Sequence, residues 1–138
     1  RTRKYRTGLV LMNELIDILI KESLIKKCGD KNSEIDRQKS VYKQLVKRAE
    51  NNDLRVQYLA NYDALLRLIE ILLLDFGYML DEQPHSTARR IINHLAPEFD
   101  ISNAIKLRHQ VKKTNHLPSL MDIKSLSLLR KRIEEISL

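Results

Sequence analysis

Apolar residues recur three or four positions apart over most of the chain, which is the spacing of one face of an α-helix. In the first half, this spacing predicts helices over residues 9–25, 33–49 and 54–78. Gly29 is expected to follow the first helix as a left-handed C-cap, and Ser33 with Asp36 is expected to cap the second. The third segment is apolar nearly all round from Leu65 onward. This pattern is typical of a central helix that packs on several sides.

The second half of the chain predicts three more helices, two of which are ended by prolines. Pro97 ends a short helix over residues 88–95, and Asp100 is the expected N-cap of the next helix. Pro118 must end that helix, because the residue before a proline is biased away from helical angles. A last helix is expected over residues 122–136.

These elements together predict an all-α protein. Five to six helices with short links and no strand pattern imply an antiparallel helical bundle. A length of 138 residues suits one domain, so residues 1–138 are expected to share a single core. The composition has 43% hydrophobic and 31% charged residues, with only three Gly and three Pro. It is too apolar for disorder and too poor in turn residues for a many-stranded sheet.

The net charge and the cysteine content indicate a class of binding partner and a cellular compartment. The formal net charge of +7 favours an anionic partner such as RNA or DNA, without indicating which one. Cys28 is the single cysteine and no leader pattern opens the chain, so the expected compartment is a reducing cytoplasm. No apolar run reaches the ~18 residues that cross a bilayer, so no membrane partner is expected. One Cys and four scattered His lack the spacing of zinc ligands, and we expect neither a metal site nor a cofactor.

Polar residues interrupt the apolar face of the predicted helix after Asp100. In this helix, "IKLRHQVKKTNH" occupies residues 105–116. At about 100° per residue, Arg108 and Asn115 fall inside an apolar stripe. The stripe consists of Ile101, Ala104, Ile105 and Val111. Burying a guanidinium without partners is costly, so Arg108 must meet an acidic residue, reach a phosphate or lie at a partly open interface.

Two histidines and three lysines accompany Arg108. His109 and His116 are seven residues apart, two turns along one edge of the stripe if the helix continues that far. Nearby lysines would make this edge strongly basic: Lys106, Lys112 and Lys113. In one interpretation, Arg108 pairs with an Asp or Glu of a neighbouring helix, and both histidines are surface residues. In the other, Arg108 and a histidine form a ribonuclease dyad that needs no metal ion. Its guanidinium stabilises charge on a phosphate, and its imidazole moves the proton of a ribose 2′-hydroxyl.

Residues 58–138 resemble the HEPN superfamily of small helical bundles. The resemblance rests on the order of a long helix "YDALLRLIEILLLDFGYML", a Pro-His-Ser-Thr turn at residues 84–87, a short helix, and a C-terminal helix with "LRHQVKKTNH". The motif of that family is an Arg, a polar residue and then a His after four to six intervening residues. The resemblance implies a homodimer that cuts RNA without metal, and a toxin with a nucleotidyltransferase-like antitoxin as its partner. Other members of the family are noncatalytic.

Residue by residue, Arg108 matches the motif arginine and His109 the polar residue after it. The resemblance thus implies catalytic roles for Arg108, His109 and His116. It also implies RNA contacts by the neighbouring polar side chains Lys106, Lys112, Lys113 and Asn115. The sequence departs from the motif because His116 stands one residue too far, about 80° around a regular helix from Arg108. Two other functions stay open: a noncatalytic HEPN-like interaction module and a basic nucleic-acid-binding regulator.

Two further positions have expected roles outside the predicted helix that contains Arg108, which we call the motif helix. His85, directly after Pro84, is expected to be a turn residue in water, with a contribution to an RNA groove as the alternative. Arg130 and Glu134 are four residues apart on the last predicted helix and are expected to pair.

Overall fold

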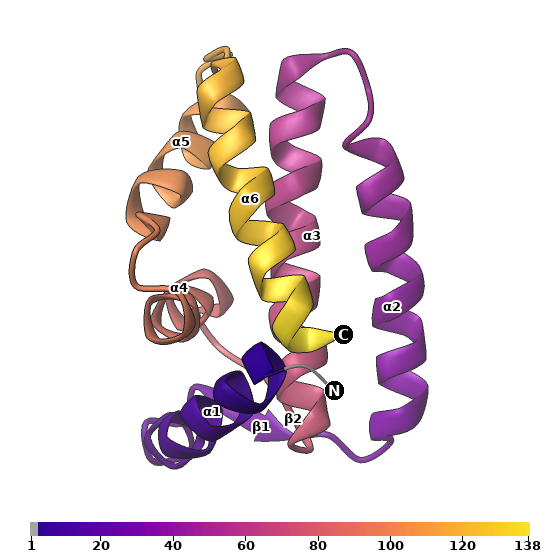
Figure 1. Ribbon diagram of the computed structural model, residues 1–138, viewed down its shortest axis with the longest axis vertical. Coiled ribbons are helices and arrows are strands. Elements are labelled where there is room, and N and C mark those ends of the chain that lie inside the picture. The colour runs from indigo at the N-terminus through magenta and orange to yellow at the C-terminus, as the bar shows by residue number, and fades with distance from the viewer. Residues whose placement is uncertain (1–2) are drawn as a thin grey trace.

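The protein is a helical bundle, as the sequence predicts. The computed structural model describes the backbone of residues 3–138 and the side chains from Val10 onward. This part of the chain forms six helices and two short strands (Figure 1). The helices are α1 (Arg3–Lys21), α2 (Lys31–Arg48), α3 (Leu54–Asp75), α4 (Pro84–Leu95), α5 (Ile101–Lys113) and α6 (Leu120–Ser137). The strands are β1 (Ile25–Lys27) and β2 (Tyr78–Leu80).

Side-chain caps set the start of four helices. Asp30 accepts a hydrogen bond from the backbone N–H of Ser33 at 3.2 Å, so the prediction that Ser33 caps α2 is wrong. Asp53 caps α3 in the same way. Asp100 caps α5 as predicted, by accepting a hydrogen bond from a backbone N–H of the first turn. Ser119 caps α6, which therefore begins slightly earlier than its apolar spacing indicates.

The chain turns after α1 into a strand that the sequence does not predict. α1 ends at Lys21, and Ser23 takes the left-handed conformation (φ 56°) that was expected at Gly29. The N–H of Leu24 bonds to the carbonyl of Leu19 at 3.0 Å, which closes a Schellman motif. The first predicted helix is therefore too long at its C-terminal end, and the assignment of Gly29 as its cap is wrong.

The two strands join the ends of α1 and α3. They pair antiparallel, with Ile25 opposite Leu80 and Lys27 opposite Tyr78. Gly77 (φ 87°) makes the turn from α3 into β2, in a conformation that glycine adopts without steric cost. Each strand has only three residues, too few for the alternation that identifies a strand, so the expectation of no strands is corrected here.

Two helical hairpins form the long part of the molecule. In Figure 1, α2 and α3 run antiparallel, α6 lies on the other side of α3, and α5 leads up into α6. α3 packs against both α2 and α6. α1 and α4 lie across the lower end, where they contact each other. The bundle is antiparallel within each hairpin, while α6 runs in the same direction as α3.

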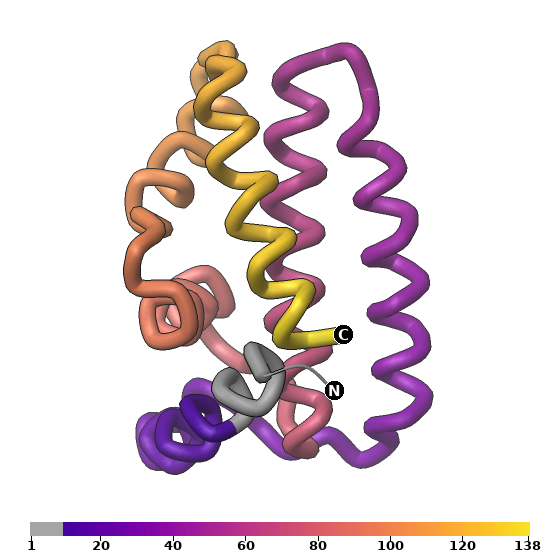
Figure 2. Tube along the Cα trace, in the orientation of Figure 1, coloured from indigo at the N-terminus to yellow at the C-terminus, as the bar shows by residue number. Residues whose placement is uncertain are grey.

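One hydrophobic core joins all six helices, and α3 is its centre. Most side chains between Leu65 and Leu74 are buried, as the apolar pattern predicts. Figure 2 shows α3 in the middle of the traced chain, between α6 and α2. Full burial of a leucine-sized side chain contributes about 1.5–3 kcal/mol, so α3 anchors its neighbours. In the part of the chain that the structure describes, no helix has the length and apolar character needed to span a membrane.

A buried polar network ties three helices together around Arg130. Nη1 of Arg130 lies 3.4 Å from Oε2 of Glu134, so the predicted pair is confirmed. The guanidinium also donates to Oδ1 of Asn61 at 3.0 Å and to the hydroxyl of Tyr42 at 2.7 Å. The Tyr42 hydroxyl donates to Glu134 at 2.8 Å, and burial followed by this hydrogen bond raises the pKa of Tyr42 to about 12. The network fixes α6 against α2 and α3.

Candidate functional site

Arg108 lies on the buried side of α5, as the sequence predicts. The buried side chains of this helix are Ile101, Leu107 and Val111, and the arc that they span includes position 108. The Arg108 side chain is only 20% exposed. A guanidinium in this position needs polar or aromatic partners, and α3 supplies them.

The Arg108 guanidinium lies against two consecutive residues of α3. Its Cζ lies 4.9 Å from the centre of the Tyr62 ring, within the range of a cation–π interaction. Its Nη2 lies 3.8 Å from Oδ1 of Asp63, which is too long for a hydrogen bond. Among the described residues, Nε of Arg108 is buried without a hydrogen-bond partner. Arg108 thus forms an ion pair with an acidic residue of a neighbouring helix, as the first interpretation predicts, while part of its hydrogen-bonding capacity is unused.

α4 brings His85 to the same tyrosine. Gln83 is left-handed (φ 54°) and Pro84 takes the first helical position, which places His85 in the first turn of α4. The Tyr62 hydroxyl and Nδ1 of His85 are 3.2 Å apart. The two ring centres are 5.9 Å apart, with their planes tilted by 30°. His85 is partly buried, so the expectation of a turn residue in water is wrong.

The surroundings of His85 favour its neutral form. Burial lowers the pKa of His85 most, and the charge of Arg108 lowers it further. Asp63 raises this pKa, and Lys112 lowers it. Burial raises the pKa of Tyr62 to about 12, against the effect of Arg108, so the phenol stays protonated at neutral pH. We call these side chains the Tyr62 cluster: Tyr62, Asp63, His85, Arg108 and Lys112.

The two histidines predicted from the motif helix have other surroundings. His109 is exposed on α5, and His116 is exposed after the helix has ended at Lys113. The Thr114 hydroxyl donates at 2.8 Å to a carbonyl one turn earlier, and Asn115 is left-handed (φ 57°). α5 therefore ends at Lys113, before Pro118 is reached, so the prediction that Pro118 ends this helix is wrong. The predicted positions of Asn115 on the apolar stripe and of His116 along its edge are wrong.

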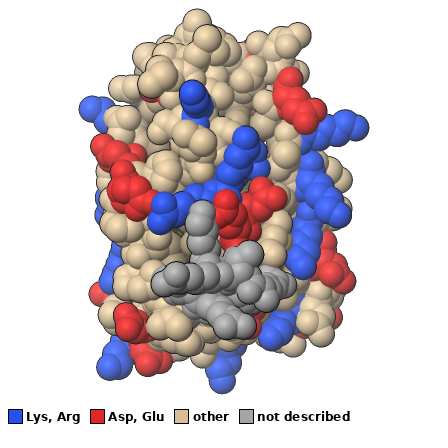
Figure 3. Space-filling model, viewed as in Figure 1, with Lys and Arg blue, Asp and Glu red and all other residues tan. Residues whose placement is uncertain are grey.

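The basic charge of the protein is concentrated in α5, α6 and the turn between them. Residues 101–137, which span these two helices and the loop between them, contain eight Lys or Arg and three acidic residues, whereas the rest of the chain has seventeen basic and fifteen acidic residues. This segment thus contributes +5 of the formal net charge of +7. On the face shown in Figure 3, basic and acidic side chains are mixed along α2, which agrees with nearly balanced charge outside the segment. A running count of charge along the sequence would have found this segment.

The three predicted lysines of α5 lie on the solvent side of this segment. Lys106, Lys112 and Lys113 are all exposed. In the described part of the chain, none of them forms an ion pair with a carboxylate. Their charges are therefore available to a ligand at the surface of α5.

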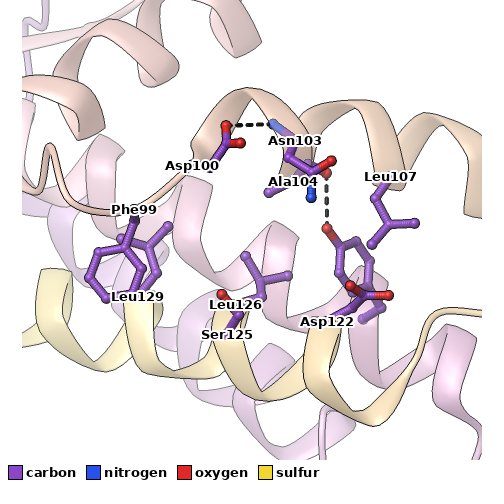
Figure 4. A pocket seen from close by; sticks show the side chains of 10 residues that line it. Phe99, Asp100, Asn103, Ala104, Leu107, Asp122, Ser125, Leu126 and Leu129 are labelled. Atoms are coloured by element: carbon purple, nitrogen blue, oxygen red, sulfur yellow. Dashed lines mark hydrogen bonds between the residues drawn. The ribbon is translucent and has the colours of Figure 1, made fainter.

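Two cavities border α5, and they differ in charge. A cavity of about 90 Å³ lies between α5 and α6 (Figure 4). Its charged lining residues, Asp100 and Asp122, are acidic and serve as helix caps, so it does not suit a phosphate. A cavity of about 230 Å³ is lined by Asp63 and Lys112 of the Tyr62 cluster and by Arg48 of α2. The second cavity extends the cluster toward another cation.

Comparisons with known proteins identified no relative of the chain. No protein-family model matches the chain, and no curated protein or solved structure was found to match it. Among the residues that the structure describes, no three His, Cys, Asp or Glu side chains gather as potential metal ligands. The candidate site therefore rests on the geometry and charge of the Tyr62 cluster.

Proposed function

We propose that the protein is an HEPN-like endoribonuclease that binds RNA along α5 and cuts it without a metal ion. The observation that supports this proposal most is that the segment that contains Arg108 carries +5 of the net charge of +7. An RNA strand presents one phosphate per nucleotide, and localised basic charge is the electrostatic signature of a protein that binds it.

RNA binding follows from the exposed cations of α5. Lys106, Lys112 and Lys113 are free of carboxylate partners in the described part of the chain. Each contact between such a side chain and a phosphate releases counterions, which favours binding at low salt. Asn115, exposed in the turn after α5, is a further side chain that can contact the strand.

Cleavage would depend on Arg108. A guanidinium in a partly buried position interacts more strongly with developing negative charge than one in bulk water. The Arg108 side chain is 20% exposed, so a phosphate oxygen can approach it from the solvent side. The resemblance assigns the proton transfer to a histidine, either His109 or His116.

The biological setting is part of the same proposal. By the resemblance, the protein acts as a homodimer, as a toxin held in check by a nucleotidyltransferase-like antitoxin, in the cytoplasm. The single cysteine agrees with a reducing compartment.

The test is cleavage of single-stranded RNA by purified protein in excess EDTA. We expect cleavage of the RNA. We expect Arg108→Gln to lower the cleavage rate by about 100-fold or more, because it removes a preorganised positive charge beside the phosphate. Lys43→Gln, at an exposed cation of α2, is the matched control and should keep the rate. Circular dichroism checks that each variant is folded. A homogeneous wild-type preparation that leaves RNA intact over long incubation contradicts the proposal.

A noncatalytic interaction module is the second candidate, and two observations favour it. Arg108 has Asp63 as an acidic neighbour, and His116 lies beyond the end of α5. This function predicts intact RNA, with the α5 surface still needed for self-association or for binding a partner, which sedimentation measures. Salt-sensitive binding of nucleic acid without cutting would instead identify a nucleic-acid-binding regulator.

A further inference from the structure

Arg108 and His85 share one side chain of α3. The Arg108 guanidinium lies over the Tyr62 ring at 4.9 Å, and the Tyr62 hydroxyl lies 3.2 Å from Nδ1 of His85. The arginine comes from α5 and the histidine from α4, so the crossing of three helices brings them together. Metal-independent phosphoryl transfer needs a fixed cation beside a group that accepts a proton.

We propose that His85 is the proton-accepting histidine of this site, in place of a histidine from the motif helix. This inference rests on the proposed ribonuclease function and names the side chain that performs its proton transfer. Arg108 binds the scissile phosphate, and Tyr62 positions both groups. His109 and His116 are then not required as the base.

Tyr62 holds the His85 ring in one orientation. When Nδ1–H of His85 donates to the Tyr62 oxygen, Nε2 keeps its lone pair for a substrate proton. Tyr62 itself is buried, which fixes the position of its hydroxyl. His85 is only partly buried, so a bound ribose can reach the ring. A hydrogen bond at one ring nitrogen of a histidine commonly fixes the protonation of the other nitrogen in this way.

The charged groups around His85 keep it in the form that accepts a proton. α3 contributes Tyr62 and Asp63, and α5 contributes Arg108 and Lys112. Burial and the two cations oppose protonation more than Asp63 favours it, because the pKa of His85 is lowered overall. The imidazole is therefore neutral at pH 7. A neutral imidazole has the free lone pair that a general base requires.

The reaction is a transesterification within the RNA strand. Nε2 of His85 takes the proton of the ribose 2′-hydroxyl, and the 2′-oxygen forms a bond to phosphorus. The bond from phosphorus to the 5′-oxygen breaks, and that oxygen takes a proton from water. The hydroxide left behind is neutralised by the proton that His85 releases. The products are a 2′,3′-cyclic phosphate and a 5′-hydroxyl, with no change of oxidation state.

The test compares histidine variants on single-stranded RNA in EDTA, with separate measurements of cleavage rate and RNA affinity. We expect His85→Gln to lower the rate by about 100-fold or more while changing the affinity less than about threefold. His94→Gln is the matched control on α4, because His94 bonds to Leu11 of α1, away from the Tyr62 cluster. Imidazole added to His85→Ala should restore part of the rate, a result that a packing defect does not give. RNA methylated at the 2′-oxygen should stay intact.

The outcomes separate this inference from the proposed function. Cleavage that survives in His85→Gln and is lost in His116→Gln overturns the inference and leaves the ribonuclease proposal standing. Loss of cleavage in His85→Gln without rescue of His85→Ala by imidazole also overturns it. Wild-type protein that binds RNA and does not cut it overturns both, whereas absence of binding contradicts the use of α5 as an RNA surface.

Discussion

Two arginines on buried helix faces differ in how fully they are satisfied. The Arg130 side chain is 9% exposed and donates to Asn61 and Tyr42, so its charge is held inside the bundle. The Arg108 side chain is 20% exposed, lies 3.8 Å from Asp63 and leaves Nε without a partner among the described residues. Buried polar groups in native proteins are normally hydrogen-bonded. Arg130 therefore has a structural role, whereas the guanidinium of Arg108 is less fully satisfied.

His85 makes the stability of the fold depend on pH. Its pKa is lowered in the folded state, first by burial, so the unfolded chain takes up the proton more readily below the ordinary value of 6.5. Neutral His85 contributes its full share to the free energy of unfolding above that value. This share is lost as the pH falls toward the pKa of His85 in the folded protein. Between about pH 7.5 and about pH 5, we expect Tm to fall further for wild type than for His85→Gln. Calorimetry at several pH values measures the difference.

A second histidine variant isolates this effect. His109 is exposed on α5, so His109→Gln should follow the wild-type curve. An identical pH dependence in wild type and His85→Gln would mean that His85 is not held neutral by the fold.

At the scale of elements, local signals predict the helices and long-range contacts decide the remainder. The apolar pattern predicts α3, and Asp100 marks the start of α5, because both signals lie within one helix. The pairing of β1 with β2 depends on residues far apart in the chain, such as Ile25 and Leu80. No spacing within either segment could have shown it.

The same limit explains how much of the candidate site could be predicted. Arg108 stood out because it breaks the pattern of its own helix. Tyr62 and Asp63 fit the pattern of α3, and nothing local links them to Arg108. His85 meets Tyr62 only because α4 crosses α3 at this point. The cluster is a property of helix packing, which a single sequence without relatives does not reveal.

The start of α6 gives a prediction about capping. The Ser119 hydroxyl accepts from the N–H of Asp122 at 3.0 Å, and the Asp122 carboxylate accepts from the N–H of Ser119 at 2.9 Å. Ser119→Ala removes one side of this capping box and should lower the free energy of unfolding by about 1 kcal/mol. Ser125→Ala, at an exposed position inside α6, should leave it nearly unchanged. Urea denaturation measures both, and an equal effect of the two variants would contradict the role of the cap.

At the scale of the whole molecule, the core and the charge are organised separately. All six helices contribute to one core around α3. The hairpin of α5 and α6, residues 101–137, carries +5 of the net charge of +7. A uniformly basic surface attracts a polyanion over the whole molecule, whereas localised basic charge directs it to one part. We propose that the α5 surface, with its three exposed lysines, binds RNA.

Salt dependence of RNA binding tests that claim most directly. The triple variant Lys106→Gln, Lys112→Gln and Lys113→Gln removes three exposed cations from α5, and Lys39→Gln, Lys43→Gln and Lys47→Gln removes three from α2. Each lost phosphate contact should reduce the slope of log affinity against log salt by about 0.7. We predict a slope shallower by up to about 2 for the α5 variant and an unchanged slope for the α2 variant. Equal slopes for wild type and both variants, or the larger change in the α2 variant, would contradict it.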